Sequence, residues 1–331
     1  MSILNNYTDF MVEKYENFPQ SRYLTLIVLR KAESEMIFRT EGSGEGLSRD
    51  TVHAGLEARD LISRVTISKR KQTAIERRTG RELLRQHNLL FYAADSRGNR
   101  QEAEDNICAL NRNKPCGICA DCMIYGYAVG GGGAQKSRVI TDDAFSVLPY
   151  QTVTAKRTFN ALYDNNTMRD PVTGQASASI QEDEYVKPET LFVDMQTLKD
   201  LTSDEIHYVI ANVLRSRRYG AISSRLGKMR NTLVGAIFSD CEIFSNLELT
   251  QCVYDRLGAE GRQFPLDENK VESVIADAVA ALTGEVIGSV QPLTDSELTE
   301  LIGEIQQTFA SPDEVKGLLD NITALYRERE T

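Results

Sequence analysis

Apolar and polar side chains alternate in part over residues 22–30, whose sequence is RYLTLIVLR. This pattern, with its β-branched and aromatic residues, is typical of a central strand that enters a core. Residues 35–40 are expected to return as a second strand, and residues 88–94 to form another. Residues 42–46 (GSGEG) have the composition of a loop. The N-terminal part of the chain is therefore predicted to contribute to a sheet.

Helical spacing follows in two further segments. Residues 50–87 change to a helical and strongly basic pattern, in which Gly80 is a weak point. Residues 203–217 place apolar side chains three and four positions apart, and this helix lies between predicted strands at residues 188–195 and 233–243. Strands and helices in this order predict an α+β fold, with a ferredoxin-like sheet that carries long insertions.

Two insertions and a distinct C-terminal segment complete the predicted organisation. One insertion contains a cysteine cluster and a run of glycines, and it has too little apolar mass to fold without a staple. The other is rich in Thr, Asn and Asp and contains the turn sequence DPVTG, so it is expected to project as a long hairpin. The expected units are residues 1–92 as the first part of the sheet domain, 93–137 as the inserted module, 138–187 as the hairpin, 188–254 as the second part of the sheet domain, and 255–331 as an acidic, mostly helical segment.

Charge is distributed unevenly along the chain. The net charge is −10, and residues 255–331 account for all of it, with sixteen acidic and six basic residues. Residues 1–254 hold equal numbers of acidic and basic side chains, so they can present basic faces to phosphate although the whole chain is acidic. The hydrophobic content of 41% supports a buried core, and no apolar run reaches the length of a membrane span. A cytoplasmic protein with no membrane partner is expected.

Four of the six cysteines lie within fifteen residues, with the spacing C-x7-C-x2-C-x2-C. In a reducing cytoplasm such a cluster is better explained by a metal than by disulfides. Four thiolates close a tetrahedron around zinc and leave no open position, so the spacing predicts a structural zinc ion. An iron–sulfur cluster and a reduced cluster packed in a core stay open as alternatives. The predicted ligands are Cys108, Cys116, Cys119 and Cys122.

Two basic segments are candidates for contact with a phosphate backbone. Residues 64–85 contain eight basic and two acidic side chains, and residues 215–230 contain six basic and no acidic ones. Contacts from such segments displace counterions and make binding strongly salt-dependent without reading sequence. Each segment can instead be a solvated surface. The candidates from the first segment are Lys69, Arg70, Lys71, Arg77 and Arg78.

The second basic segment also carries residues suited to single-stranded nucleic acid. A tyrosine ring can stack on a base, glycines allow close approach of the backbone to a phosphate, and serine hydroxyls can donate hydrogen bonds to its oxygens. The candidates here are Arg217, Arg218, Tyr219, Gly220, Ser223, Ser224, Arg225, Lys228 and Arg230. Residues 130–133 are glycines without P-loop spacing, and Lys136 and Arg138 after them are further candidates for backbone contact.

The sequence offers little support for catalysis. The three histidines lie far apart, so catalysis through histidine is not expected. Acidic residues such as Asp50, Asp142 and Asp143 can bind a divalent ion in a nuclease, but their spacing does not favour this over a solvated loop. A zinc-stapled module that binds proteins and no nucleic acid is a third class that stays open.

Four segments carry a resemblance to a known family: residues 68–85 (SKRKQTAIERRTGRELLR), 116–126 (CGICADCMIYG), 136–147 (KSRVITDDAFSV) and 218–229 (RYGAISSRLGKM). The chain resembles the CRISPR-associated backbone subunits of the subtype I-D Cascade complex over nearly its whole length. Together the four segments are specific to this family, whereas taken singly only the cysteine segment is. The resemblance implies a modified RNA-recognition-motif palm, a zinc-containing insertion and a thumb-like hairpin that separates guide nucleotides into short segments.

The resemblance also implies a function and partners. Such a subunit binds the guide RNA (crRNA), polymerises along it head-to-tail with further copies of itself, contacts other subunits of the effector complex, and presents the guide for pairing with foreign target DNA. The thumb falls within residues 142–186, with its working end near Phe159, Asn160 and Leu162 or near the turn that begins at Met168. The alternative is a metal-dependent endonuclease that cuts the target strand at regular intervals, for which Asp50 is the candidate. We expect a binding subunit and not an enzyme.

Overall fold

The computed structural model describes most of the chain. The described residues are 2–39, 46–95, 99–110, 112–130, 133–160, 162–177, 180–220 and 224–327.

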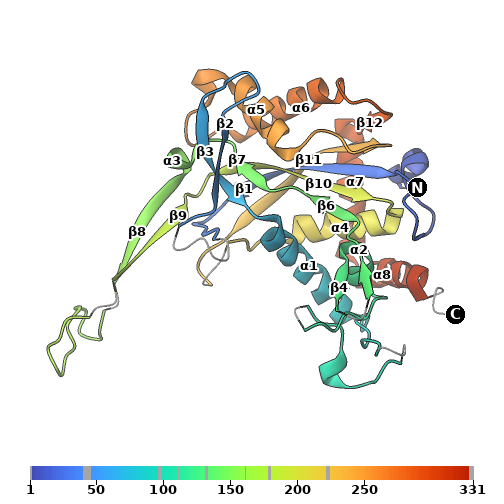
Figure 1. Ribbon diagram of the computed structural model, residues 1–331, viewed down its shortest axis with the longest axis horizontal. Helices are drawn as coiled ribbons and strands as arrows, with labels where there is room; N and C mark the ends of the chain where they lie inside the picture. The colour runs from blue at the N-terminus through green and yellow to red at the C-terminus, as the bar shows by residue number, and fades with distance from the viewer. Residues whose placement is uncertain are drawn as a thin grey trace.

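An antiparallel sheet runs through the centre of the body (Figure 1). Its central strand β1 (Tyr23–Ala32) lies between β11 (Met229–Ser239) and β10 (Leu191–Lys199). Along β1, Leu26 and Val28 pack into one core while Ile27 and Leu29 pack into another. Both faces of the sheet are therefore covered, which explains why this strand is apolar at nearly every position.

Shorter strands extend the sheet on both sides. Beyond β10 lie β6 (Val139–Thr141) and β7 (Ala144–Ser146), then β3 (Leu61–Ile67) and β2 (Arg49–His53), while β12 (Val290–Pro292) lies beyond β11. Helix α1 (Lys69–Gln86) connects β3 to the later part of the sheet, and α4 (Ser203–Arg215) connects β10 to β11. The chain order β1, α1, β7, β10, α4, β11 is thus a β-α-β-β-α-β order, with the sheet order β11-β1-β10-β7.

Helices cover the two faces of the sheet differently. Helices α1 and α4 pack on one face, together with η1 (Ile3–Phe10), α7 (Asp295–Ala310) and α8 (Pro312–Arg327). Helices α5 (Asn246–Gly261) and α6 (Glu268–Thr283) pack on the other face (Figure 1). The prediction of a mostly helical C-terminal segment is confirmed. Among the helices of the described residues, none combines the length and the apolar character that a membrane crossing requires.

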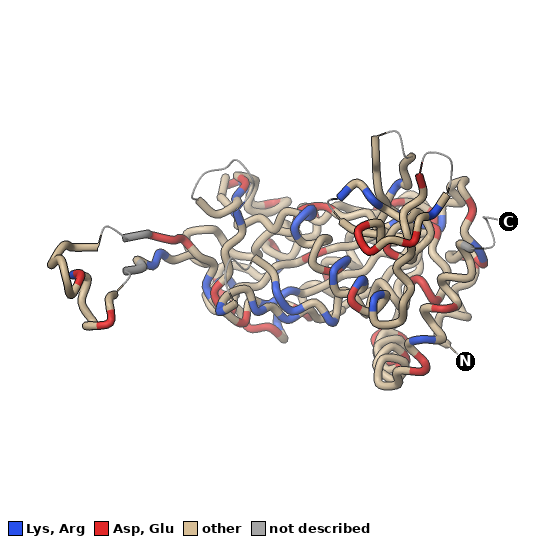
Figure 2. The backbone as a smooth tube through the Cα atoms, turned by 90° about the horizontal axis from the view of Figure 1, so that it is seen from below, with Lys and Arg blue, Asp and Glu red and all other residues tan. Residues whose placement is uncertain are grey.

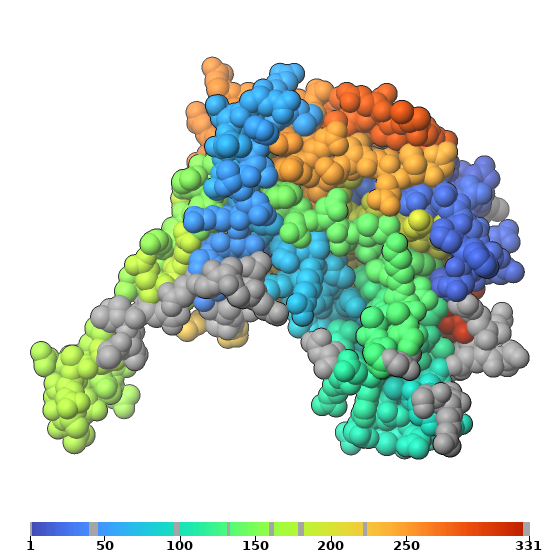
Figure 3. Space-filling view, viewed as in Figure 1, coloured from blue at the N-terminus to red at the C-terminus, as the bar shows by residue number. Residues whose placement is uncertain are grey.

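Two smaller units project from the same side of the body (Figure 1). One is the cysteine module, with η2 (Glu104–Asn106), α2 (Ala120–Tyr125) and the paired strands β4 (Tyr127–Val129) and β5 (Gly133–Gln135), which packs through α2 on α1 and α8. The other is a hairpin of β8 (Thr154–Asn160) and β9 (Ile180–Val186), which follows the short helix α3 (Tyr150–Val153). Figure 3 shows a hollow beneath the body between these two units.

Several predicted elements differ from those observed. Residues 35–39 and 88–94 form isolated bridges, such as Met36 with Val186, and not the expected strands. Local apolar content predicted them, whereas a strand also needs a partner along its length. In the region expected to be helical, β2 and β3 form a hairpin at the edge of the sheet, and the helix begins only at Lys69. The hairpin expected from residue 138 begins at Thr154, because β6 and β7 pair with β10 in the main sheet.

Candidate metal centre and nucleic-acid interface

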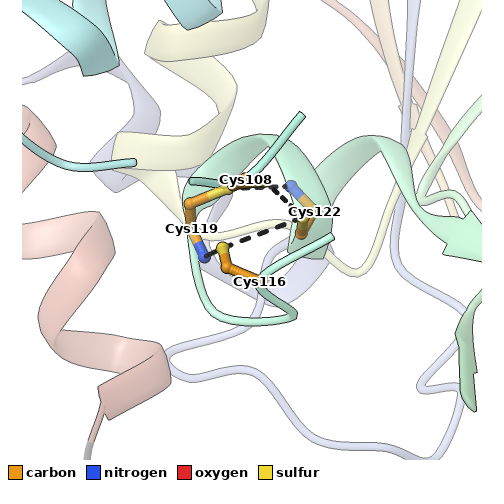
Figure 4. A group of neighbouring side chains, drawn as sticks. All are labelled: Cys108, Cys116, Cys119 and Cys122. Atoms are coloured by element: carbon orange, nitrogen blue, oxygen red, sulfur yellow. Dashed lines mark hydrogen bonds between the residues drawn. The ribbon is translucent and has the colours of Figure 1, made fainter. Parts of the chain in front are cut away.

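The four predicted cysteine ligands meet in the module beneath α1. Figure 4 shows their side chains grouped together, with Cys119 at the N-cap of α2 and Cys122 inside its first turn. The Sγ atom of Cys108 lies 3.9 Å from that of Cys119 and 3.5 Å from that of Cys122, and the Sγ atoms of Cys116 and Cys122 are 4.0 Å apart. All four side chains are buried, and all four sulfur atoms lie within 4.8 Å of one another.

This geometry fits one metal ion. A tetrahedron of thiolates about 2.3 Å from a central ion has sulfur–sulfur separations of about 3.8 Å, which is close to the observed distances. Sulfurs within 4.8 Å of one another leave no room for an iron–sulfur cluster, whose inorganic core lies between its cysteine ligands. The backbone N–H groups of Cys119 and Cys122 also donate to the Sγ atoms of Cys116 and Cys119, at 3.3 and 3.5 Å. Such bonds stabilise thiolates.

Helix α1 holds the cysteine module in place through charged side chains. Arg77 donates to Asp121 through two bonds of 2.9 Å, and Arg81 donates to the same carboxylate at 2.8 Å. Arg81 also lies 3.5 Å from the Sγ atom of Cys108 and donates to its carbonyl. Burial lowers the pKa of Arg81, but Asp121 and Cys108 together outweigh this effect, so the net pKa lies above its ordinary value and the guanidinium stays charged. Arg77, predicted to contact phosphate, is instead one of the residues that anchor the metal centre.

The outer face of α1 remains basic. Arg70, Lys71 and Arg78 are exposed there, and we call these three residues the basic helix face. Lys69, predicted to belong to this face, is buried and forms an ion pair with Asp194 of β10. A basic residue at the start of the helix points into the core because a buried carboxylate lies opposite it.

The basic loop, which we define as residues 217–220 and 224–228, lies between α4 and β11. Arg217, Arg218, Ser224 and Arg225 are exposed and Lys228 is half-buried. The loop is closed at its base, where the N–H of Tyr219 donates to the carbonyl of Gly227 at 2.8 Å and Arg218 pairs with Lys228 as a bridge. Gly220 has a φ of +55°, and a Cβ atom there would lie 2.8 Å from the ring of Phe38. Ser223 lies outside the described residues.

The fold brings the basic loop against α1, the helix that carries the basic helix face. The hydroxyls of Thr79 in α1 and Ser216 at the end of α4 are 2.9 Å apart, and the Tyr219 hydroxyl lies 3.3 Å from Glu76 of α1. Figure 3 shows α1 above the hollow between the hairpin and the cysteine module, and Figure 2 shows Lys and Arg segments on this side of the body. Helix α1 and the basic loop, about 140 residues apart in sequence, therefore contact each other, and we call their exposed cations together the basic surface.

Comparison with known proteins identifies the family. The chain matches the family model described as Csc2 Crispr over residues 10–319. The chain belongs to the Csc2 family of CRISPR proteins. The crystal structure of Thermofilum pendens Csc2 is similar to it in fold, with 17% identity, a TM-score of 0.63, and coverage of 100% of this chain and 98% of that chain. A chain from a structure titled "CRISPR RNA-guided surveillance complex, pre-nicking" has 9% identity and a TM-score of 0.46, covering 81% of this chain and 90% of that one. No curated protein matches the chain.

Three further candidates for RNA contact are placed differently in this Csc2 family member. Tyr219, expected to stack on a base, is only 1% exposed, and its hydroxyl bonds to buried polar groups. Arg138 is buried and pairs with Glu205 of α4. Arg230 pairs with Glu268 of α6, with 2.6 Å between Nη2 and Oε2. Their residue types predicted contact with phosphate or bases, but each of these side chains is bonded to a partner from another element of the fold. Lys136, by contrast, is exposed.

The hairpin carries the residues predicted for a thumb. Leu162 is 59% exposed and Met168 is half-buried near the tip, where Val172 is also exposed. The side chains of Phe159 and Asn160 lie outside the description. At the base, Arg157 pairs with Glu35, and Arg39 pairs with Asp183. These ion pairs hold the hairpin against residues 35–39, the segment that also pairs with the basic loop through Ile37 and Gly220.

Asp50, the nuclease candidate, lies on β2 with its carboxylate exposed. It accepts a hydrogen bond of 2.8 Å from the Thr66 hydroxyl and lines a pocket of about 420 Å³ together with Asp143 and Glu184. Among the described residues, only the four cysteines bring three or more metal-ligating atoms within 4.8 Å of one another. The carboxylates of this pocket are not gathered in that way.

Sequence reasoning missed a buried polar network under the basic surface. Arg30, at the end of β1, is fully buried and bonds to Asp194 of β10 and to Glu76 of α1. Burial raises the pKa of Asp194, but the charges of Lys69 and Arg30 outweigh this and hold it below its ordinary value. The position of Arg30 within the apolar strand β1 was the available signal, since a cation there needs a buried partner.

Proposed function

We propose that this Csc2 family protein is a guide-RNA-binding backbone subunit of a CRISPR interference complex of subtype I-D. The observation that carries the proposal is the contact between the basic loop and α1, the helix that carries the basic helix face, above the hollow. Membership of the Csc2 family supports the CRISPR context. The β-α-β-β-α-β order supports an RNA-recognition-motif-like palm of the ferredoxin-like type.

In this proposal the protein holds the RNA backbone and does not read its bases. Arginine and lysine side chains that neutralise phosphates release counterions, and the guide itself supplies specificity by pairing with target DNA. The residues that remain suited to phosphate contact are exposed or half-buried; they are Arg70, Lys71, Arg78, Lys136, Arg217, Arg218, Arg225 and Lys228.

We further propose that the cysteine centre holds zinc in a structural role. Zinc prefers four-coordinate tetrahedral sites, and four cysteine ligands leave no open position for a substrate. When bound, the ion supplies cross-links between the loop at Cys108 and helix α2. The hairpin would act as the thumb, and copies of the chain would add head-to-tail along the guide, next to other subunits of the complex.

RNA binding measured by electrophoretic mobility shift across a salt series tests the proposed function. We expect single-stranded RNA to bind more tightly than duplex DNA of equal length, with affinity falling steeply as salt rises. Arg218→Ala and Lys71→Ala should each lower the slope of log affinity against log salt by about 0.7. Lys316→Ala is the matched control, because Lys316 is exposed on α8 and pairs with Asp320. Absence of RNA binding at low salt would overturn the proposal.

We propose binding and not strand cutting as the activity, and the nuclease alternative is tested separately. Asp50→Ala removes the predicted metal-binding carboxylate, whereas Asp50→Asn keeps the acceptor for the Thr66 hydroxyl. In the assembled complex, both variants should leave any cutting of the target strand at regular intervals unchanged. Loss of such cutting in both variants, with RNA binding intact, would support the nuclease role.

A further inference from the structure

The buried network beneath the basic surface centres on Arg30 and joins several elements of the fold. Arg30 of β1 donates to Asp194 of β10 at 2.7 Å, to Glu76 of α1 at 2.9 Å and to Asn231 of β11 at 2.9 Å. Arg30, Asp194 and Glu76 are fully buried. The basic loop also enters the network, through Tyr219. One guanidinium therefore lies at the meeting point of the sheet, the basic helix and the basic loop.

Stability alone does not account for this network. Moving charged groups out of water is costly, and replacing a buried ion pair with apolar side chains of similar volume is often neutral or stabilising. Polar networks of this kind do impose one arrangement, because each donor accepts few geometries. Here the groups that are aligned are α1 and the basic loop, the two elements that carry the exposed cations.

Tyr219 connects the loop to the network through its hydroxyl group. The oxygen lies 3.3 Å from an Oε1 of Glu76, 3.3 Å from Nη1 of Arg30 and 3.1 Å from Nδ2 of Asn231. The O–H can donate to the carboxylate while the oxygen accepts from the other two. Asn231 also donates to the carbonyls of Val213 and Ser216 at 2.8 and 2.9 Å, so the end of α4 is held by the same contacts.

Tyr219 directly follows two of the exposed arginines. Arg217 and Arg218 precede it, and the N–H of Gly227 on the opposite side of the loop donates to the carbonyl of Glu35 at 2.8 Å. A loop anchored at its base loses less conformational freedom when it binds a ligand, and this raises affinity without adding a contact. The anchor also determines where both arginines lie relative to the basic helix face.

We propose that Tyr219 and Glu76 are positioning residues for RNA binding. Their hydrogen bond fixes the basic loop on α1, so that the loop and the basic helix face contact one RNA strand in register. Neither side chain touches the RNA. This inference rests on the proposed function and specifies how its binding surface is held together.

Tyr219→Phe tests the inference, because it removes the hydroxyl and keeps the buried ring. We expect RNA affinity to fall roughly three- to tenfold and the salt slope to become shallower, since fewer phosphates are engaged at once. Amide hydrogen exchange at Tyr219 and Gly227 should become faster. The matched control is Tyr7→Phe, which removes a hydroxyl that bonds to Glu297 at 2.8 Å from a ring only 3% exposed, far from the loop in sequence.

A second variant distinguishes a specific loss of the contact with α1 from a general loss of stability. Thr79→Val keeps the shape of the side chain and breaks the hydroxyl contact between α1 and Ser216, the residue at the end of α4 that directly precedes the loop, so it should weaken RNA binding in the same direction. Equal losses of RNA affinity in Tyr219→Phe and Tyr7→Phe would overturn the inference. Unchanged affinity, slope and exchange in Tyr219→Phe, with a wild-type protein that binds RNA, would overturn the inference alone. A wild-type protein that binds no RNA would overturn the proposed function, and this role with it.

Discussion

Gly80 shows how one missing side chain decides the packing of two helices. The helical pattern predicted a weak point there, yet α1 continues through it from Lys69 to Gln86. A Cβ atom at this position would lie 2.3 Å from the hydroxyl oxygen of Tyr208 and 2.5 Å from Nδ2 of Asn212, both on α4. The glycine therefore lets α1 approach α4 closely. In this position α1 places Arg77 and Arg81 against Asp121 of the cysteine module.

Gly80→Ala should lower the free energy of unfolding by about 1–3 kcal/mol, because the methyl group overpacks the contact with α4. Helix propensity alone predicts the opposite, a gain of about 1 kcal/mol. Gly303→Ala is the matched control, since Gly303 is exposed in α7 and a Cβ there meets no atom within 4 Å. Urea unfolding of both variants provides the measurement, and a stabilised Gly80→Ala would contradict the packing argument.

At the scale of elements, the cysteine module contains little regular structure of its own. Helix α2 spans six residues and β4 and β5 three residues each. Elements this short form few hydrogen bonds and bury little surface, so a bound ion contributes much of the stability of such a module. The ion pairs of Arg77 and Arg81 with Asp121 join the module to α1, so loss of the ion is expected to destabilise this contact as well.

Cys119→Ser should abolish stoichiometric metal binding and lower the midpoint of thermal unfolding. Wild-type protein is expected to contain about one zinc ion per chain, measured by elemental analysis after purification. Cys241→Ser is the matched control, because Cys241 lies outside the cluster and is half-buried. Wild-type protein with no bound metal, or Cys119→Ser that keeps its metal, would contradict the assignment.

The contact between α4 and α7 predicts a dependence of stability on pH. Burial lowers the pKa of His207 below its ordinary value, and the carboxylates of Glu304 and Asp204 offset this only in part. The unfolded chain therefore takes up a proton at a higher pH than the folded chain, so this histidine removes stability as pH falls below about 6.5. His207→Gln should show a smaller loss of unfolding free energy between pH 7 and pH 5 than wild type, measured by urea unfolding at each pH. An unchanged difference would contradict the assignment.

At the scale of the whole molecule, the basic surface and the start of the acidic segment lie on opposite faces of the sheet. The basic helix face belongs to α1 on one face, while α5 and α6 cover the other (Figure 1). Residues 255–331 carry the whole net charge of −10; of their helices, α6 covers the second face, whereas α7 and α8 pack on the same face as α1. The acidic residues of this segment are therefore divided between the two faces of the sheet.

Addition of copies along a guide predicts that the mass of the complex rises in steps with RNA length. Replacing residues 162–177, the hairpin tip with its exposed Leu162 and Val172, by a short Gly-Ser link should leave thermal unfolding nearly unchanged and remove the steps. Analytical ultracentrifugation with RNAs of increasing length measures both proteins. Stepwise growth in the variant would show that the tip does not join the copies.

The sequence by itself determined the features that depend on residue type and local spacing. The four cysteines meet as their spacing predicted, β1 and the acidic C-terminal helices form where predicted, and the predicted helix at residues 203–217 is observed as α4 (Ser203–Arg215). Periodicity and ligand spacing are local, so a single chain reveals them. The same holds for the basic character of residues 64–85 and 215–230.

Only the tertiary structure decided which charged and aromatic side chains remain available. Lys69, Arg77, Arg138 and Tyr219 have the residue types of a nucleic-acid surface, yet each is held by a partner from another element of the fold. Whether a cation faces phosphate or a buried carboxylate depends on which elements pack together, and no local pattern encodes that. The same packing brings two distant basic segments onto one side, because α1 and the loop after α4 share a buried network.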